Sequence, residues 1–311
     1  MAMRAPPILN VSGESLPEAW ENAFFEIGVK GMTYKRKDER DSGKQLDSGM
    51  VIEVKNPDAD PFSHKIGGTN AVGAPLLDYF YEILGAKDSW LKDFGNPKDT
   101  RWDYLYHERL AKHPAGAIDQ IKFAINRLIT NPSSRRTNII TWHPERDTIY
   151  QDTPCLQRIW FNIIPGQEGQ NDVLDMRYHF RSRNVVNASF GNMLGLYMLG
   201  CHIRDEVEQA TGKNLDMRMV DQIDSFHVNT KDMKQFYSNH SRINQSEPLE
   251  KRTFKRSMVV DWLKEERKGV EDVILKQTKK HFTGNFEAEE LRVKGIGDRV
   301  FYLLGKYAPR E

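Results

Sequence analysis

Residues 152–163 read DTPCLQRIWFNI, and they combine a possible nucleophile with a strand-like segment. The part from residue 156 onward is rich in aliphatic and aromatic side chains and is closed by Pro165-Gly166, which predicts a buried β-strand. Cys155 stands directly before it. A lone cysteine is most often a small buried residue. Its thiolate is also a strong nucleophile, so its surroundings decide between the two interpretations.

The segments around this strand have clear periodicities. Apolar and polar residues alternate over 174–180, which predicts a strand with one buried face. Isoleucine and leucine side chains share one face over 118–129, which predicts a helix ended by Asn131-Pro132. We expect a mostly buried helix over 190–210, capped by Gly212. Further expected elements are a helix over 76–84, strands over 49–54, 137–142 and 215–220, and a helical tail from about residue 259.

Strands and helices therefore interleave along the chain. The chain has neither a G-x-G-x-x-G motif nor a P-loop, and it contains no repeat or convincing linker. Its 311 residues, 39% of them hydrophobic, suffice for a substantial core. We predict a single mixed α+β domain spanning residues 1–311.

Composition excludes several classes of protein. Charged residues make up 29% of the chain but leave a net charge of +1, so we expect neither a DNA partner nor a polybasic membrane surface. Two cysteines, Cys155 and Cys201, give no disulfide scaffold, and Cys201 in an apolar run reads as a buried structural thiol. With no H-E-x-x-H motif and scattered histidines, we expect no metal. No segment resembles a signal peptide or a membrane span, which favours a cytoplasmic location.

Basic and hydroxyl-bearing segments flank Cys155 in the sequence. Arg135 and Arg136 precede it, and Arg181-Ser182 and then Asn192 follow it. Nearby cations favour a thiolate, and arginine binds phosphate through a planar pair of donors. The pattern indicates a cysteine nucleophile that acts on an anionic substrate. Each short motif has an ordinary interpretation as well, such as a surface arginine pair or a capping asparagine.

The order of these motifs resembles the thymidylate synthase and pyrimidine-nucleotide hydroxymethylase family. The resemblance is best over residues 75–235, and it is weak at both ends of the chain. It implies a large twisted mixed sheet with flanking helices, in a homodimer packed sheet to sheet with shared active sites. It also implies a reaction on a pyrimidine nucleoside monophosphate. The thiolate adds to C6, and C5 takes a one-carbon unit from 5,10-methylenetetrahydrofolate.

The resemblance also assigns roles to individual residues. Cys155 takes the place of the nucleophile, and either Glu82 or Asp78 that of the acid which handles the proton. The other matches are Arg181 and Ser182 for the phosphate in the same subunit, Arg135 and Arg136 for the phosphate across the dimer, Arg40 as a looser phosphate match, Asn192 for the base, His227 for the sugar, and Trp102 and Asn184 for the folate.

Departures from the family pattern shape the expected product. An asparagine amide, as in Asn192, can match the uracil edge, whereas the cytosine branch usually carries aspartate there, so we expect dUMP as substrate. Asn184 replaces a usual aspartate, Asn229 replaces a sugar-side tyrosine, and residues 305–311 lack the apolar tail that seals the site. These changes favour hydroxymethylation over methylation. The alternatives are a divergent thymidylate synthase, a dCMP or CMP hydroxymethylase, and a catalytically silent relative that binds a nucleotide or RNA.

Overall fold

The computed structural model describes residues 5–36, 43–93, 96, 98–99, 101–149 and 152–309. Its centre is an eight-stranded mixed sheet of order β1-β3-β9-β7-β6-β5, in which β2 pairs with β3 and β8 with β9. The strands are β1 Ile8–Gly13, β2 Met32–Arg36, β3 Gly43–Val54, β5 Asn138–Ile140, β6 Leu156–Ile164, β7 Asp172–Phe180, β8 Arg183–Asn184 and β9 Leu215–Val228. A separate two-stranded sheet pairs β4 Ser63–His64 with β10 Thr253–Phe254.

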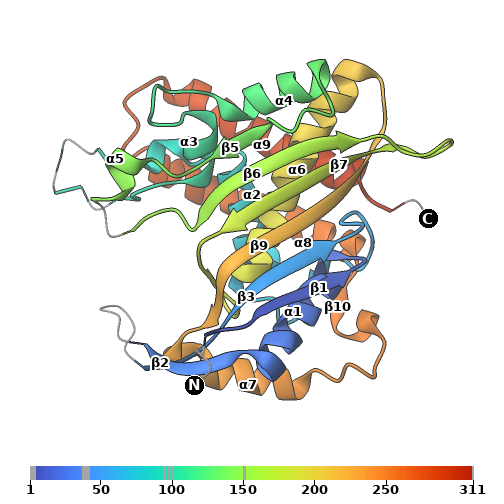
Figure 1. The fold of residues 1–311 in the computed structure, drawn as a ribbon. Coiled ribbons are helices and arrows are strands. Elements are labelled where there is room, and N and C mark those ends of the chain that lie inside the picture. Colours follow the sequence, from blue (N-terminus) through green and yellow to red (C-terminus); the bar gives the residue numbers. More distant parts are fainter. Residues whose placement is uncertain are drawn as a thin grey trace.

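The helices pack on one side of the large sheet (Figure 1). The α-helices are α1 Leu16–Lys30, α2 Gly73–Ile83, α3 Tyr106–Ala111, α4 Gln120–Thr130, α5 Pro144–Asp147, α6 Ser189–Thr211, α7 Met233–Arg242, α8 Arg256–Thr278 and α9 Phe286–Lys306. Short 3₁₀ helices are η1 Thr69–Ala71, η2 Asp88–Trp90, η3 Thr230–Asp232 and η4 Leu249–Lys251. The predicted mixed α+β fold, with a large mixed sheet flanked by helices, is confirmed.

Most elements expected from periodicity are present. β6, β7, α2, α4 and α6 match their predicted ranges closely, and Gly212 caps α6 in the left-handed conformation with φ of 68°. β3 and β9 are longer than the predicted strands 49–54 and 215–220, because they pair with each other along most of their length. β5 is shorter than predicted. β1 and α1 occupy a region where the sequence predicted no element.

The alternation in β7 has one informative exception. Met176, Tyr178 and Phe180 are buried beneath the helices as predicted. Asp175, on the opposite face of the strand, is also fully buried, because Arg177 and Arg218 cover its carboxylate and bond to it. Cys201 is buried in α6, as the sequence predicted for a structural thiol. Burial raises the pKa of this thiol to about 11.

The other face of the sheet carries polar and aromatic side chains, and none of the described helices covers it (Figure 1). The half-exposed side chains there include Trp160 of β6 and Arg177 of β7, whose guanidinium lies 5.1 Å from the indole centroid. In the part of the chain that the structure describes, no helix combines the length and apolarity needed to cross a membrane.

Candidate active site

Cys155 and Arg181 lie side by side at one end of the sheet. β6 and β7 are antiparallel with Leu156 opposite Phe180, so the residue before β6 faces the residue after β7. The Arg181 N–H donates to the Cys155 carbonyl oxygen at 2.9 Å. Its guanidinium donates through Nε to Pro154 O at 3.1 Å and through Nη2 to Thr153 O at 2.8 Å. The Arg181 guanidinium is therefore fixed against the backbone of the two residues that precede the half-buried Cys155.

Two tyrosines pack close to Cys155. Tyr106 Oη accepts a hydrogen bond of 3.4 Å from the Leu156 N–H, and the Tyr104 ring lies 5.6 Å from the Tyr106 ring. Burial, followed by the negative charge of a Cys155 thiolate, holds the pKa of Tyr104 above its ordinary value. Burial does the same to the pKa of Tyr106. Both phenols therefore stay protonated and are able to donate hydrogen bonds near the thiol.

A cavity of about 230 Å³ lies against these tyrosines. Its walls include Glu82 and Tyr79 from α2 and Asn192 from the first turn of α6. Tyr79 Oη donates to Asn192 Oδ1 at 3.2 Å. Burial raises the pKa of the Glu82 carboxyl, although the nearby Lys87 ammonium opposes this effect. The wall of the cavity therefore contains a carboxyl whose pKa is raised and an amide that accepts a hydrogen bond from a phenol.

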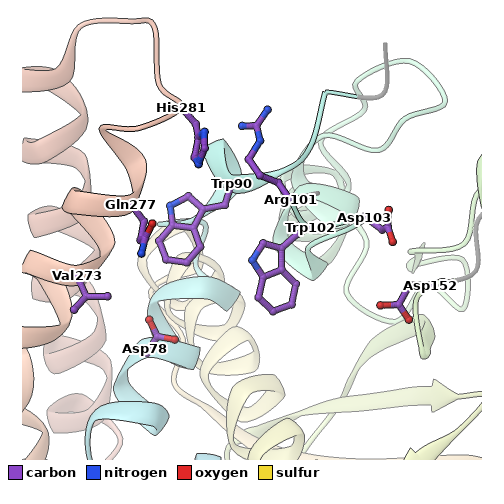
Figure 2. Close-up of a pocket in the computed structure, with 9 residues that line it drawn as sticks. All are labelled: Asp78, Trp90, Arg101, Trp102, Asp103, Asp152, Val273, Gln277 and His281. Carbon is purple, nitrogen blue, oxygen red and sulfur yellow. The ribbon is translucent and has the colours of Figure 1, made fainter. Parts of the chain in front are cut away.

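A second cavity, of about 710 Å³, shares Trp102, Asp103 and Asp152 with the first. Figure 2 shows the indoles of Trp90 and Trp102 between the end of α8 and the loop before α3. Its remaining lining residues are Asp78, Arg101, Val273, Gln277 and His281. The two candidate acids therefore face different cavities, Glu82 the smaller and Asp78 the larger.

Ser182, Asn184 and His227 belong to the same end of the sheet. Asn184 of β8 is paired in register with His227 of β9, and Ser182 is half-buried just before β8. The buried His227 ring donates through Nδ1 to the Ser225 carbonyl at 3.1 Å. The Asn184 amide is already engaged: Nδ2 donates to Asp232 Oδ2 at 2.7 Å. Its Oδ1 accepts from the N–H groups of Val186 and Asn187.

Arg135 and Arg136 are not brought to Cys155 within one chain. The Arg135 carbonyl accepts from Trp160 Nε1 at 2.9 Å, and both side chains are exposed. Trp160 is five residues along β6 from Cys155, a separation of about 17 Å on an extended strand. Arg40, the looser phosphate match, lies outside the described residues.

The sequence predicted the thiol, the arginines and the asparagine, but not the residues that complete the cavities. Sequence reasoning missed Tyr79, Trp90 and Asp103, which line the cavities, and Lys87, which pairs with Asp78. One signal was present for Lys87: two acids lie one helical turn apart in α2, and a basic residue follows the Gly85 stop. Among the described residues, no group of three or more metal-ligating side chains is placed to hold an ion.

Comparison with known proteins identifies the family of this chain. The family model described as thymidylate synthase matches residues 85–283. The chain is 30% identical over 207 residues to a Methanothermobacter thermautotrophicus protein, covering 65% of this chain and 87% of that one. It is 34% identical over 165 residues to a Methanocaldococcus jannaschii protein, covering 50% and 65% respectively. A Methanococcoides burtonii protein is 26% identical over 203 residues, covering 65% and 83%. All three carry the name "Putative thymidylate synthase". The matched family region contains Cys155, Arg181, Asn192 and His227, and the chain belongs to the thymidylate synthase family.

Proposed function

We propose that this chain is a one-carbon transferase that uses 5,10-methylenetetrahydrofolate to hydroxymethylate C5 of a pyrimidine nucleoside monophosphate, with dUMP as the preferred substrate. One observation carries the proposal. Cys155 pairs through its backbone with Arg181, and it lies close to Tyr104 and Tyr106, which line a cavity together with the Glu82 carboxyl and the Asn192 amide. Family membership supports the same chemistry.

The proposed reaction begins at the thiol. The Cys155 thiolate adds to C6 of the pyrimidine, and the electron pair of the C5–C6 double bond moves toward C5. Arg181 and Ser182 hold the phosphate, and the phenols of Tyr104 and Tyr106 donate hydrogen bonds near the reacting ring. Once C5 has gained its new carbon, a carboxylate on α2 takes the C5 proton, the electron pair forms the C5–CH2 double bond, and the bond from that carbon to the folate nitrogen breaks, so that tetrahydrofolate would leave. Water then adds to the resulting methylene, the C5–C6 double bond reforms, and the C6–Sγ bond breaks to release the thiolate.

The larger cavity fits the proposed folate. Its volume of about 710 Å³ lies within the usual range for small-molecule sites. The indoles of Trp90 and Trp102 offer flat apolar faces to an aromatic ring, and Asp78 and Asp103 offer acceptors for its N–H groups. The folate supplies the one-carbon unit. Asn184 stays a proposed folate contact, and it would have to give up its bonds to Asp232 or to the backbone to make one.

The preference for uracil rests on Asn192. Its amide both donates and accepts, as the N3–H and O4 edge of uracil requires. The Tyr79 hydroxyl bonds to Oδ1 and leaves Nδ2 available to donate to a carbonyl oxygen such as O4. His227 lies in β9, opposite Asn184 of β8, and we propose that it contacts the sugar.

Access of water supports hydration over hydride transfer. Trp102, a wall of both cavities, is 54% exposed. The described C-terminal segment lies away from the smaller cavity, because Tyr307 Oη donates to Glu208 near the end of α6. Glu208 is sixteen residues along that helix from Asn192, a separation of about 24 Å. A wet site favours capture by water, because hydride transfer depends on excluding it.

Methylation is the second candidate, since the relatives are named as thymidylate synthases. The two products are separated by incubating the protein with dUMP and methylenetetrahydrofolate and weighing the nucleotide. Hydroxymethylation leaves tetrahydrofolate, whereas methylation produces dihydrofolate and its rise in absorbance. A methyl product with an equal amount of dihydrofolate would replace the hydroxymethylase proposal by a divergent thymidylate synthase.

We further propose a homodimer packed through the uncovered face of the sheet. Arg135 and Arg136 lie beside this face and about 17 Å along β6 from their own Cys155, which suits donation to a neighbouring subunit. An inactive Cys155→Ala variant mixed with an inactive Arg135→Ala variant is expected to regain activity in hybrid dimers. No recovery, once subunit exchange has been demonstrated, would contradict shared sites.

A further inference from the structure

Lys87 lies between the two candidate acids. Its side chain is only 5% exposed, and its Nζ lies 2.6 Å from Asp78 Oδ2 and 3.4 Å from Glu82 Oε2. The same ammonium is 4.9 Å from the centroid of the Trp90 ring. A buried lysine is costly unless it is paired. This one connects an acid of the larger cavity, an acid of the smaller cavity and a wall of the larger one.

The end of α2 is built to place this lysine. Gly85 has φ of 94°, which turns the chain back over the last turn of the helix. A Cβ at Gly85 would come within 2.4 Å of the His107 ring, so a larger residue does not fit. The Ala86 N–H donates to Tyr81 O at 2.8 Å, and Arg292 of α9 donates to Gly85 O at 2.7 Å. The turn is therefore held from two sides.

The two acids have different environments. Asp78 makes the shorter contact with Lys87 and is 38% exposed, so water and the ammonium both stabilise its charge. Glu82 makes the longer contact and is 15% exposed. Two carboxyls one turn apart repel each other when both are ionised. Lys87 opposes that repulsion, and it lies closer to the more exposed Asp78 than to the more buried Glu82.

We propose that Lys87 is a positioning residue that divides the work of the two acids, holding Asp78 as a fixed negative charge and keeping Glu82 able to take up and release the proton of the C5 reaction. The role in the reaction rests on the proposed function. The effect of Lys87 on the charge of Glu82 does not, because it follows from contacts that exist without a substrate.

The groups around Glu82 shift its pKa in opposite directions. Burial raises the pKa of Glu82, Lys87 lowers it through its charge and its hydrogen bond, and Asp78 and Asp88 raise it again. The remaining titratable groups near Glu82 are Tyr79, Asp103, Tyr104, Tyr106 and Asp152 in its cavity, with Glu271 of α8 bonded to Tyr81 and Arg292 of α9 bonded to the Gly85 turn. Without Lys87, all of the nearest effects raise the pKa of Glu82. A larger fraction of Glu82 would then be protonated and unable to accept a proton.

The direct test is the titration of Glu82 in the protein without substrate. The ionisation is followed by carbon-13 NMR of labelled carboxyl groups, and the Glu82 signal is identified by its loss in Glu82→Gln. In Lys87→Met we expect the pKa of Glu82 to rise, because an adjacent opposite charge that favours the ionised carboxyl is removed. Lys87→Arg should keep it near the native value. Asp78→Asn removes a like charge and should therefore lower the pKa of Glu82.

Lys268→Met is the matched control. Lys268 also pairs with an aspartate, at 2.7 Å, but its side chain is 88% exposed on α8. This variant loses the same charge and should leave the Glu82 titration unchanged. If Lys87→Met unfolds, Lys87→Gln serves instead, since it keeps a donor but not the charge, and the same upward shift is expected. An unchanged Glu82 titration in a folded Lys87→Met or Lys87→Gln variant would overturn the proposal.

Turnover gives the second readout. Release of tritium from dUMP labelled at C5 is measured against pH, and removal of the proton requires an ionised carboxyl. In Lys87→Met, the acidic limb of this profile should shift to higher pH by the same amount as the Glu82 titration. In Lys87→Arg, the limb should lie at its native pH again. A shifted titration with an unshifted limb would overturn the role of Glu82 in the reaction. No tritium release by the native protein would count against the proposed function, while the titration would still decide the effect of Lys87.

Discussion

The hydrogen bond between Tyr79 and Asn192 offers a sharp test of how the base is recognised. Tyr79 is 7% exposed, and its hydroxyl donates to Asn192 Oδ1 at 3.2 Å. Tyr79→Phe removes this donor and little else. A neutral buried hydrogen bond is worth about 0.5–1.5 kcal/mol, and 3.2 Å is longer than usual for a hydrogen bond from a hydroxyl to an oxygen. We therefore expect a loss of about 0.5–1 kcal/mol in transition-state binding, or roughly two- to fivefold in kcat/KM for dUMP.

The assay is a competition between dUMP and dCMP with native and variant protein. Tyr79→Phe should reduce the preference for dUMP, because the Asn192 amide is no longer held with Nδ2 free for O4. Tyr81→Phe is the matched control on the same helix. Its hydroxyl donates to Glu271 of α8 at 2.6 Å, away from the cavity, so its loss should lower stability and leave base preference unchanged. The reasoning is refuted if Tyr79→Phe leaves kcat/KM for dUMP unchanged or lowers both nucleotides equally.

Two further variants test the base contact and the buried ion pair between Arg183 and Asp221. Asn192→Asp should shift preference toward cytosine nucleotides, because a carboxylate accepts from an amino group and repels a carbonyl oxygen; unaltered preference in the same competition assay would contradict the role of Asn192. Arg183→Met should lower the free energy of unfolding by about 3–5 kcal/mol, because it leaves the buried Asp221 carboxyl without its ion-pair partner. Urea denaturation measures this loss, and a change below about 1 kcal/mol would show that the pair is dispensable.

The elements predicted correctly are those whose pattern is set by local burial. β7 alternates because one face packs beneath the helices, and α6 is mostly apolar over residues 190–201 because it is buried along most of its length. α1 shows the limit of reading average polarity. Leu16, Trp20, Phe24 and Ile27 form a helical stripe, but the many charged residues of the N-terminal segment hide it.

The site is harder to predict because long-range packing assembles it. The order of Cys155 and Arg181 in the sequence is informative, but their contact depends on β6 and β7 being antiparallel neighbours. Tyr79 and Asn192 are 113 residues apart and meet only because α2 packs on the start of α6. Lys87 meets Asp78 and Glu82 through a left-handed turn at Gly85, whose direction a sequence pattern does not specify.

Covalent trapping tests the central claim most directly, namely that Cys155 attacks a pyrimidine nucleotide and that C5 then receives a one-carbon unit. The protein is incubated with 5-fluoro-dUMP and methylenetetrahydrofolate, denatured and digested, and its peptides are weighed. Fluorine at C5 replaces the proton that must leave, so the reaction should stop with nucleotide and folate both attached to the peptide that contains Cys155. Cys155→Ala should give no adduct. A native protein that forms no adduct, or forms one on the buried Cys201 instead, would contradict the account.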